Sequence, residues 1–473
     1  MVLDGGRPDY LNIARLPHLD ALMARGARFS NVVDGILEAE TPAGHTTLST
    51  GSPPSANGIL GFNWANDNDR FTLFDAATVR SGAIERIMEA AHVPTIASLY
   101  KDRFPRARVV ALSGHKYYAA DPLGGPAADT ILYYHGDDRG RYVPAYIPGH
   151  PPPPGLLTDR ELISPTMHLP PGGEDTLVTK LALAAFARMH QRLTLINFPE
   201  FDWPLGHVFG GIANRARVIQ RMRAFDRDLG MIERAYRKAG ILKQTLFVVT
   251  ADHGMLPIRR TISQQIVTSA VSLAGTTAPD IAFNTGAYVW LTDPTRSQLV
   301  ARNILAAHDP GVQAVYYLSD STGGPHYVRA GGSFADADSR KADAELVATL
   351  IDGREPAVVV LTREGQTFSS PSYGWKGDHG GASWQSQHIP LVIAGPGIRQ
   401  GVVSHPARLE DVAPTVLAAM GVKPVGMDGT ILTEALLNAP RREERARRRA
   451  IELTAPIVDG LKAQERRDLE RGG

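Results

Sequence analysis

Short, continuous apolar runs recur along the chain and alternate with longer stretches of helical periodicity. The runs lie at 108–112, 193–198, 245–250 and 389–394. They are rich in valine, isoleucine and leucine and end in polar or glycine-rich turns, as is typical of parallel strands buried on both faces. The stretches at 176–189 and 213–239 repeat apolar residues at three- and four-residue steps, which predicts helices. The alternation predicts an α/β fold with a largely parallel sheet.

Two regions interrupt this rhythm. Residues 148–173 are rich in proline and predict a stiff loop or the edge of a lid. Further strand-like and helical segments at 287–291, 296–307, 312–318 and 357–361 predict an inserted α+β cap at 258–370. We therefore expect a core formed by 1–257 and 371–438. The charge-dense tail at 439–473 is expected to be a helix with a solvated face.

The composition narrows the possible classes of protein. Of the 473 residues, 43% are hydrophobic and 21% are charged, which is ordinary for a globular protein and excludes a long disordered chain. The formal net charge of +1 argues against a dedicated nucleic-acid binder. No apolar run approaches the roughly 18 residues of a transmembrane helix. The chain has no cysteine, so any metal must bind to histidine, carboxylate or hydroxyl groups.

The beginning of the chain shows no signal peptide, because Asp4 follows directly after Met1-Val2-Leu3. Val2-Leu3 is expected to be the end of a longer buried strand. The sequence as given predicts a cytoplasmic protein, and an exported protein is the alternative if an N-terminal segment is missing. The sequence does not predict the oligomeric state.

Aspartate and histidine residues follow or flank the ends of several predicted strands, which is where ligands gather in parallel sheets. Taken singly, such an aspartate often only caps a helix, and a lone histidine is more often a hydrogen-bonded core residue. Together, three aspartates and three histidines suit two divalent metal ions, and this mixture of donors is typical of zinc. The six residues are Asp4, Asp202, His207, Asp252, His253 and His379.

A candidate nucleophile lies at the start of a predicted helix. Thr41 is followed by Pro42, and a hydroxyl residue before proline is a helix-start signal. The N-terminus of a helix favours anions such as phosphate. A metal bound to the Thr41 hydroxyl would lower its pKa and make it a nucleophile. Without metal ligands, the expected role of Thr41 would be to cap the helix.

The ordered set of motifs resembles the alkaline phosphatase superfamily, in its nucleotide pyrophosphatase/phosphodiesterase branch. The segments that carry the resemblance are 4–11, 41–51, 202–207, 252–255, His379, 390–398 and 411–415. They span nearly the whole core, but neither the cap nor the tail. The resemblance implies a doubly wound α/β fold with helices on both faces of the sheet.

The resemblance also implies how the site is divided between two zinc ions. One zinc would be held by Asp202, His207 and His379. The other would be held by Asp4, Asp252 and His253, with Thr41 bound to it as the nucleophile. The resemblance implies hydrolysis of a phosphoric ester through a phospho-threonine on Thr41.

One departure from the family pattern concerns the spacing of two ligands. The family commonly spaces this aspartate and histidine at i and i+4, whereas five positions separate Asp202 from His207. Pro204 lies between them and excludes a regular helix interior. We expect a looser turn to bring the two side chains together.

Two further departures concern the groups that would contact phosphate. Phe62 occupies the place of the family's phosphate-binding asparagine, and Asn63, one position later, is the candidate replacement. Related monoesterases place a lysine and an arginine over the non-bridging oxygens. Here Lys116 is present but no arginine follows it. The missing cation favours a diester or pyrophosphate substrate over a monoester.

The sequence therefore predicts a phosphodiesterase or nucleotide pyrophosphatase that acts on a small phosphate ester or nucleotide, with no stable binding of nucleic acid. The cap, with Trp375 and Lys376 near His379, is expected to select the leaving group. The alternatives are a phosphomonoesterase, a phosphonate hydrolase, transfer to an acceptor other than water, a manganese-dependent mutase, and a catalytically degenerate binding protein. A sulfatase is disfavoured because the motif that precedes its formylglycine does not occur.

Overall fold

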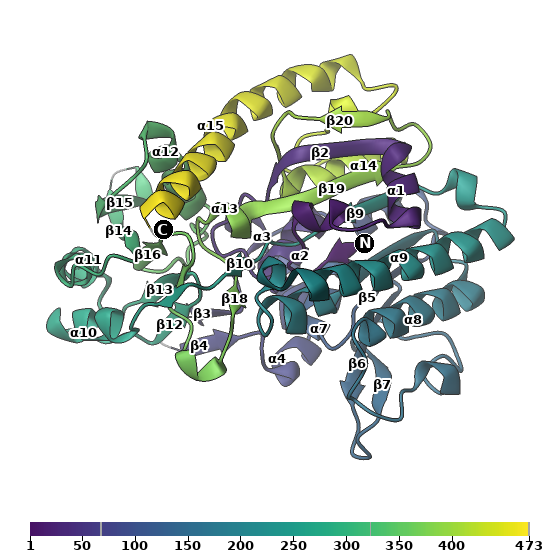
Figure 1. The fold of residues 1–473 in the computed structure, drawn as a ribbon, viewed down its shortest axis with the longest axis horizontal. Helices are drawn as coiled ribbons and strands as arrows, with labels where there is room; N and C mark the ends of the chain where they lie inside the picture. Colours follow the sequence, from purple (N-terminus) through teal and green to yellow (C-terminus); the bar gives the residue numbers. More distant parts are fainter. Residues whose placement is uncertain (67–68, 322, 472–473) are drawn as a thin grey trace.

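The structure is a computed structural model that describes residues 1–66, 69–321 and 323–471. Its centre is a ten-stranded sheet with the order β20-β2-β19-β9-β1-β8-β5-β6-β7, and β21 pairs with β2 (Figure 1). The strands are β1 (Val2–Leu3), β2 (Gly26–Val33), β5 (Val109–Leu112), β6 (Thr130–Gly136), β7 (Tyr142–Tyr146), β8 (Leu193–Phe198), β9 (Phe247–Thr250), β19 (His388–Ala394), β20 (Gly401–Val403) and β21 (Ala407–Arg408). The four predicted strands are all present, and the α/β prediction is confirmed.

The sheet is mostly parallel, as predicted, but two strands run in the opposite direction. β1, β5, β6, β8 and β9 are joined by parallel pairings. β19 is antiparallel to both β2 and β9, and β7 is antiparallel to β6. The prediction that 389–394 is one of the parallel strands is therefore wrong in direction. As a consequence, the amino end of β19 lies at the same edge of the sheet as the carboxyl end of β9.

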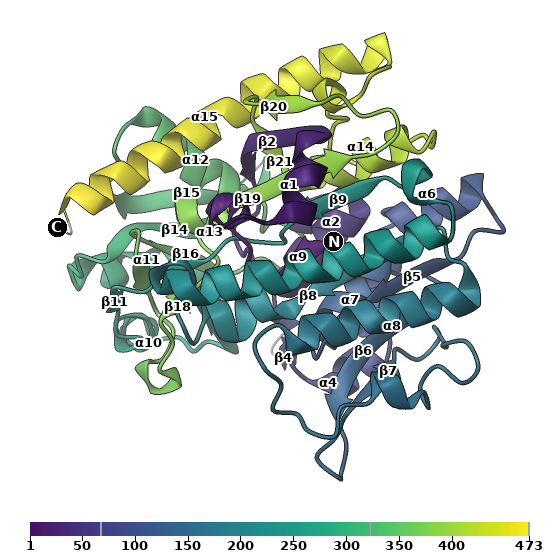
Figure 2. The ribbon, with the colours of Figure 1, turned by 45° about the vertical axis from the view of Figure 1, so that its right-hand side comes forward.

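Helices cover both faces of this sheet, as expected. On one face, α1 (Pro17–Ala24), α8 (Gly173–Met189) and α9 (Arg215–Lys238) share a hydrophobic cluster with the strands, and α8 and α9 lie in front of the sheet in Figure 2. The other face carries the helices of a second cluster. Among these are α2 (Thr41–Thr50), α4 (Ala76–Arg80), α5 (Ala83–Ala90), α6 (Ile96–Arg103), α7 (Tyr117–Gly124), α13 (Trp384–Gln387) and α14 (Val412–Ala419). The short helix α3 (Pro54–Asn57) packs on α2.

The region predicted to be a cap contains a five-stranded antiparallel sheet of its own. Its order is β12 (Asp280–Phe283), β13 (Gly286–Trp290), β16 (Val358–Thr362), β14 (Val312–Ser321) and β15 (Gly324–Gly332). Helices α10 (Gln265–Leu273) and α11 (Ser297–Ala306) pack on one face of this sheet. On the other face, Tyr288 and Trp290 join the large cluster of the core. This sheet therefore rests directly against the core.

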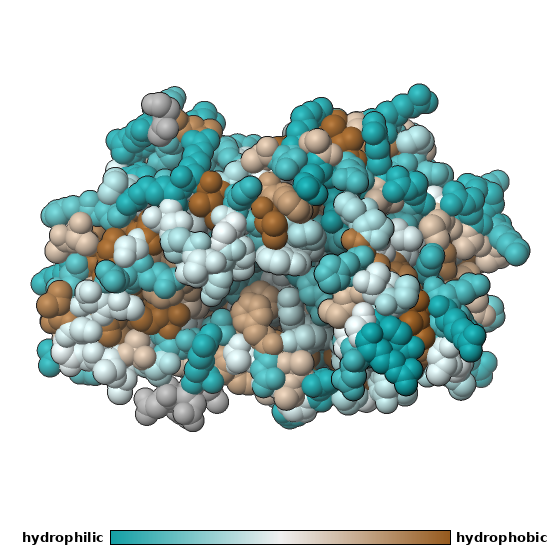
Figure 3. Space-filling model, turned by 60° about the horizontal axis from the view of Figure 1, so that its bottom comes forward, coloured by the Kyte–Doolittle hydropathy of each residue, from teal (hydrophilic) through white to brown (hydrophobic). Residues whose placement is uncertain are grey.

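Part of the cap surface is apolar. Leu273 at the end of α10 is 77% exposed, and Leu299 on α11 is 41% exposed. In Figure 3 the cap lies on the left, and brown patches appear on this part of an otherwise mixed surface. In the described part of the chain, no helix combines the length and the apolar character that a membrane span requires.

Small two-stranded sheets connect the cap and the core near the site. β10 (Leu256–Pro257) pairs with β18 (Gly377–Asp378), and β11 (Arg260–Thr261) pairs with β17 (Gln366–Thr367). A separate hairpin consists of β3 (Asn63–Asn66) and β4 (Asp69–Thr72). The pairing of β10 with β18 fixes both ends of the cap segment at one place on the core.

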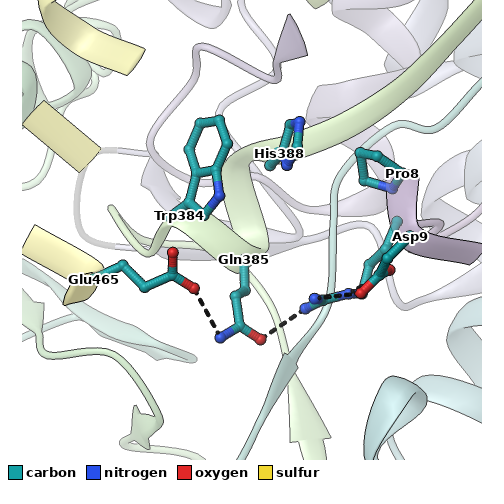
Figure 4. A pocket seen from close by; sticks show the side chains of 7 residues that line it. Pro8, Asp9, Trp384, Gln385, His388 and Glu465 are labelled. Atoms are coloured by element: carbon teal, nitrogen blue, oxygen red, sulfur yellow. Dashed lines mark hydrogen bonds and ion pairs between the residues drawn. The ribbon is translucent and has the colours of Figure 1, made fainter. Parts of the chain in front are cut away.

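The charged tail folds as one helix, α15 (Arg441–Arg471), which packs along α12 (Ala337–Ala348) of the cap. The expected solvated face is only part of this helix. Arg447 is buried and its guanidinium lies 3.1 Å from the carboxylate of Glu434. Further along α15, Glu465 accepts a hydrogen bond from Gln385, which in turn accepts one from Arg7 (Figure 4). These polar contacts attach the tail to the core. The run of charged residues in the sequence could not predict them, because the partners are distant in sequence.

Candidate active site

The carboxyl ends of three adjacent strands bring the predicted ligands together. β1 ends just before Asp4, β9 ends two residues before Asp252, and β8 is followed by a short turn that leads to Asp202. Because β1 lies between β8 and β9 and all three are parallel, these side chains meet at one edge of the sheet. Asp4, Asp202, His207, Asp252, His253 and His379 are all buried.

His379 reaches the same edge from the opposite direction. It precedes β19, and the amino end of this antiparallel strand lies beside the carboxyl end of β9. Its ring stacks on that of His253 with the centroids 3.7 Å apart. The structure therefore assembles all six predicted ligand residues into one cluster.

Each of the three histidines is oriented by a main-chain carbonyl. The Nδ1 atoms of His207, His253 and His379 lie 2.9 Å from the carbonyl oxygens of Gly377, Gly254 and Ala39, respectively. These contacts assign the proton to Nδ1 and leave Nε2 with a free lone pair, as in histidines that bind metals. The Nε2 atoms of His207 and His379 lie 3.2 Å and 3.6 Å from Asp202 Oδ1.

The donor atoms form two groups that suit a divalent ion. Asp4, Asp252 and His253 form one group, and Asp202, His253 and His379 form the other, with the donors of each within 4.8 Å of one another. Asp202 Oδ1, Asp252 Oδ2 and His253 Nε2 are buried and form no hydrogen bond among the described residues. His207 and His45 approach the two carboxylate oxygens as ion-pair contacts of 3.2 Å and 3.1 Å. Such orphaned acceptors inside a protein are costly unless a cation meets them, so the cluster fits two metal ions.

The turn between Asp202 and His207 is wider than an α-helical turn, as predicted from Pro204. The amide of His207 donates to the carbonyl of Asp202, five residues earlier, over 3.0 Å. Trp203 leaves the helical conformation, with φ −120° and ψ 120°. The widened turn accommodates one extra residue, and the two candidate ligands still meet, with His207 Nε2 3.2 Å from Asp202 Oδ1.

Trp203 begins an aromatic surface beside the ligands. Its side chain is 42% exposed, and its ring centroid lies 6.4 Å from that of Trp375. Trp375 in turn contacts the ring of His207 at 4.1 Å and that of Tyr373 at 4.8 Å. We call Trp203, Tyr373 and Trp375 the aromatic platform.

Thr41 is the first residue of α2, and it is buried beside the cluster. Glu40 precedes it, and the Glu40 carboxylate accepts hydrogen bonds from the amide of Phe62 and from the side chain of Asn284. The helix packs closely on the strand-end turn, since a Cβ on Gly44 would overlap the main-chain oxygen of Asp252. Thr41 is therefore placed by α2 against the aspartate that the sequence assigned to the same metal.

Lys116 occupies the middle of the site. It immediately precedes α7, and its ammonium lies 2.7 Å from Asp4 Oδ1 and 2.6 Å from Asp202 Oδ2. The same nitrogen lies 3.2 Å from the Thr41 hydroxyl. One cation thus contacts both predicted ligand groups and the predicted nucleophile.

The charged groups of the site strongly shift one another's pKa values. Burial alone would lower the pKa of Lys116, but Asp202 and Asp4 raise it well above its usual value. Burial alone would raise the pKa of Asp202, but Lys116 and His207 hold it well below its usual value. For His379, burial and the neighbouring His253 hold the pKa well below its usual value. Lys116 is therefore charged, and His379 is neutral, which is the form that binds metals.

Asn63 is not placed with the other site residues, contrary to the expectation from the sequence. Its side-chain oxygen accepts a hydrogen bond from Arg70 across the β3–β4 hairpin, at 3.1 Å. Phe62 instead packs inward, where its ring contacts those of Phe74 and Tyr118 with centroids 3.9 Å and 4.9 Å apart. Alternation along β3 explains the difference, because neighbouring residues of a strand face opposite sides.

Two residues that the sequence did not single out support the cluster. His45 Nδ1 lies 2.8 Å from the carbonyl oxygen of Thr41 and 3.1 Å from Asp252 Oδ2. Asn197 donates to Asp4 Oδ2 over 2.8 Å. The signal for His45 was available, because residues at i and i+4 of a helix share a face. Asn197 is a polar residue near the end of a buried strand, which is a weaker signal.

Comparison with known proteins places this geometry among phosphoric ester hydrolases. The sequence pattern described as type I phosphodiesterase / nucleotide pyrophosphatase matches residues 1–382, a range that includes every site residue named above. The alkaline phosphatase PhoK of Sphingomonas sp is 32% identical over 126 residues. That match covers 25% of this chain and only 22% of PhoK.

Two solved structures share the fold over nearly the whole chain. The wild-type alkaline phosphatase PafA superposes with a TM-score of 0.70 at 16% identity, over 92% of this chain and 98% of that one. Murine ectonucleotide pyrophosphatase / phosphodiesterase 5 gives a TM-score of 0.60 at 16% identity, over 91% and 96% of the two chains. At such identities the likeness concerns the fold.

Proposed function

The chain belongs to the type I phosphodiesterase / nucleotide pyrophosphatase family, and we propose that it is a zinc-dependent phosphodiesterase with Thr41 as its nucleophile. The family reaction is the hydrolysis of phosphoric esters. The observation that supports the finer proposal is the position of the Thr41 hydroxyl, which lies 3.2 Å from Lys116 Nζ. The same ammonium contacts Asp4 and Asp202, two of the six buried candidate ligands.

The proposed division of ligands follows the strand ends. Asp4, Asp252 and His253 would hold the metal on the Thr41 side, and Asp202, His207 and His379 would hold the other. His253 also lies within the second group of donors, and His207 contacts Asp202 directly. Two zinc ions would supply positive charge for the phosphoryl oxygens and lower the pKa of the Thr41 hydroxyl.

The residues of the chain then perform the displacement. The Thr41 hydroxyl gives its proton to water as its oxygen attacks phosphorus, and the bond from phosphorus to the leaving oxygen breaks as that oxygen departs with the electron pair. With a diester, Thr41 then carries the phosphoryl group together with the ester group that was not displaced. Water attacks this phosphorus, the bond from phosphorus to the Thr41 oxygen breaks, and a proton from that water restores the Thr41 hydroxyl. Lys116 does not act as the base, because a charged ammonium only donates hydrogen bonds. At 3.2 Å from Thr41 Oγ1 it is in reach of a non-bridging oxygen of the phosphoryl group on Thr41.

The environment of phosphate favours a diester over a monoester. Of the described residues, Lys116 is the one Lys or Arg in hydrogen-bond contact with Thr41. Phe62 stands where the family has an asparagine donor, and it packs against Tyr118 rather than offering a hydrogen bond. A monoester dianion needs more donors than a diester monoanion, because unpaired charge in a buried site is costly.

The aromatic platform supplies a surface for the leaving group. It adjoins His207, one of the residues proposed to hold the metal that is not assigned to Thr41. Exposed tryptophan and tyrosine rings stack on flat groups such as aryl rings and nucleobases. We therefore place a planar leaving group against Trp203 and Trp375. Murine ectonucleotide pyrophosphatase / phosphodiesterase 5, which shares the fold, has been solved with AMP in an inactive form.

A trapping experiment tests the nucleophile and the class of substrate together. The protein would be mixed with an aryl phosphodiester, quenched in acid within one turnover, digested, and analysed by mass spectrometry for a peptide in which Thr41 carries the phosphoryl group with its remaining ester group. Thr41→Ala should retain two zinc per chain by elemental analysis and lose both the label and nearly all turnover. Thr41→Ser, which keeps the hydroxyl, is the matched control. Label on another residue, or turnover by Thr41→Ala above a few per cent, would refute the assignment.

A second candidate is a phosphomonoesterase of the same fold. Lys116 favours it, since a cation at the nucleophile suits a dianion, and alkaline phosphatases are among the similar proteins. Rates for matched aryl monoesters, diesters and phosphonates separate the two. A preference of tenfold or more for the monoester would replace the diesterase proposal.

A further inference from the structure

A short loop carries Lys116 into the site. Residues 113–116 connect β5 to α7 and form neither helix nor strand. On one side the loop is tied to the sheet, because the amide of Tyr134 on β6 donates to the carbonyl of Gly114 over 2.9 Å. This bond holds the middle of the loop. The position of Lys116 also depends on what holds His115, the residue directly before it.

One oxygen of Glu174 holds His115. Glu174 lies in the first turn of α8, and its side chain is only 12% exposed. Its Oε1 atom accepts hydrogen bonds from the amide of His115 over 2.6 Å and from the hydroxyl of Tyr142 on β7 over 2.5 Å. The same oxygen lies 2.9 Å from Nδ1 of the His115 ring. Hydrogen bonds to an ionised carboxylate are stronger than those between neutral groups, so Glu174 fixes the main chain next to Lys116.

The contact between Glu174 and the loop is both charged and close. Burial alone would lower the pKa of His115, but Glu174 raises it above its usual value. Burial alone would raise the pKa of Glu174, but His115 lowers it below its usual value. A Cβ on Gly114 would overlap Glu174 Oε1 and would lie 2.7 Å from Pro199 Cγ. The loop therefore packs directly against Glu174 and against the turn that begins at Pro199.

Asp175, the next residue of α8, holds that turn. The amide of Glu200 donates to Asp175 Oδ1 over 3.3 Å, and the amide of Asp175 donates to Glu200 Oε2 over 3.4 Å. Asp175 is fully buried, and the turn at 199–201 leads directly to Asp202. The first turn of α8 therefore contacts both segments that supply the 2.6 Å pair between Lys116 and Asp202.

α8 is a firm support for these contacts. Its buried side chains, among them Val178, Leu181 and Ala185, belong to the hydrophobic cluster that the helix shares with the central strands. Side chains on a packed helix are held more precisely than side chains on a loop.

We infer that two adjacent acids of α8 are positioning residues, Glu174 for Lys116 and Asp175 for Asp202. Each acts through the main chain of another segment, so neither is a catalytic residue. The inference rests on the proposed function, because the position of Lys116 affects the reaction only if phosphate is bound beside Thr41. Lys116 meets phosphate charge, whereas Asp202 is a proposed zinc ligand. Loss of the two acids should therefore cause two different defects.

The position of Lys116 can be observed without turnover. In the full chain labelled with 15N-lysine, its buried ammonium should give a separate NMR signal because it lies between Asp4 and Asp202. Lys116→Arg identifies this signal by removing it. Glu174→Ala should shift or broaden the signal. Glu174→Gln keeps an acceptor oxygen and should change the signal by a smaller amount.

Substrate selectivity is the second readout for Glu174. Glu174→Ala should lower kcat/KM for an aryl monoester about fivefold more than for the matching diester, since even a 1 Å misplacement of a group at the reacting centre is costly in rate. In a Lys116→Ala background, Glu174→Ala should not change this ratio further, because residues that act through one another are not additive. Glu174→Gln should change the ratio in the same direction and by less.

Zinc affinity is the readout for Asp175. Asp175→Ala should weaken zinc binding about 10- to 100-fold in competition with a chelator, the usual effect of losing a group that orients a ligand. With excess zinc, the ratio of monoester to diester rates should remain that of the wild type. Asp175→Asn keeps an acceptor for the amide of Glu200 and should retain most of the affinity. Unchanged zinc affinity in Asp175→Ala would overturn this role of Asp175.

Glu233→Ala is the matched control for loss of a glutamate that pairs with a histidine. The Glu233 side chain is 8% exposed on α9, and its carboxylate lies 2.9 Å from His18 Nδ1. This variant should leave the Lys116 signal, the substrate ratio and the zinc affinity unchanged, whatever its effect on stability.

The outcomes separate this inference from the proposed function. If the Lys116 signal and the substrate ratio of Glu174→Ala match the wild type, or if the change in ratio persists in the Lys116→Ala background, Glu174 does not position Lys116. If Glu174→Ala does not fold, Glu174→Gln is judged by the same two readouts. If the wild type hydrolyses no phosphoric ester while the Lys116 signal still responds to Glu174, the proposed function fails and the positioning role stands.

Discussion

The ammonium nitrogen of Lys116 lies 3.2 Å from the hydroxyl oxygen of Thr41. The same nitrogen contacts Asp4 and Asp202, which belong to the two different ligand groups. The Lys116 side chain therefore contacts the proposed nucleophile and one candidate ligand of each proposed metal. A substitution of Lys116 should therefore weaken the stabilisation of negative charge on the phosphate and leave the Thr41 nucleophile in place.

Lys116→Ala should lower kcat/KM for an aryl phosphomonoester at least tenfold more than for the matching diester. The monoester carries the additional charge that this ammonium meets, and a factor of ten corresponds to about 1.4 kcal/mol, within the range of a hydrogen bond to a charged group. Steady-state rates with both substrates at saturating zinc measure the difference. Lys376→Ala, at an exposed lysine near the site, is the matched control. Equal losses for both substrates would contradict contact between Lys116 and the phosphate.

His45→Ala should weaken zinc binding roughly 10- to 100-fold, the usual effect of removing a group that orients a ligand. The imidazole Nδ1 lies 3.1 Å from Asp252 Oδ2 and holds this carboxylate in place. Competition with a chelator measures the affinity, and excess zinc should restore much of kcat. His45→Gln, which retains a donor, should lie between the wild type and His45→Ala. If His45→Ala loses activity but keeps its zinc affinity, His45 has a role other than positioning Asp252 for zinc.

Trp203→Ala should lower kcat/KM about tenfold for a diester with an aryl or nucleoside leaving group, since stacking on one ring contributes about 1–3 kcal/mol. A diester with a methyl leaving group should react at nearly the wild-type rate. The Trp203 side chain is 42% exposed and is not one of the candidate ligands, so the metal content should not change. Phe74→Ala is the control, because it removes an exposed ring that contacts Phe62 and does not belong to the aromatic platform. Equal effects on both leaving groups would argue against stacking.

Asp343→Asn should make the protein more stable at pH 8. Asp343 is buried in α12, and burial raises its pKa to about 8 although Gln313 donates to it over 2.6 Å. An unfolded aspartate titrates near pH 4. Between these values the folded chain keeps a proton that the unfolded chain releases, so stability falls as the pH rises.

Asparagine keeps an acceptor for Gln313 and carries no charge. The melting temperature of the variant should therefore exceed that of the wild type by an amount that grows from pH 5 to pH 8. Asp338→Asn, at an exposed position of the same helix, controls for loss of surface charge. If the melting temperatures of the wild type and Asp343→Asn change equally between pH 5 and pH 8, Asp343 is not protonated in the folded protein.

The sequence was most informative where chemistry and local structure coincide. The runs at 193–198 and 245–250 are apolar and β-branched, and each is followed within a few residues by an aspartate. Because neighbouring parallel strands end at the same edge, the meeting of Asp202 and Asp252 followed from the pattern alone. Pro204 likewise required the wide turn that the structure shows.

By itself, therefore, the sequence determined the α/β class, the six candidate ligand residues and the position of Thr41 at a helix start. Only the tertiary structure decided three further matters. β19 runs antiparallel and thereby brings His379 to the site, Asn63 accepts a hydrogen bond from Arg70, and Lys116 reaches both groups of candidate ligands. Strand direction, side-chain face and the reach of a long side chain depend on partners that are distant in sequence.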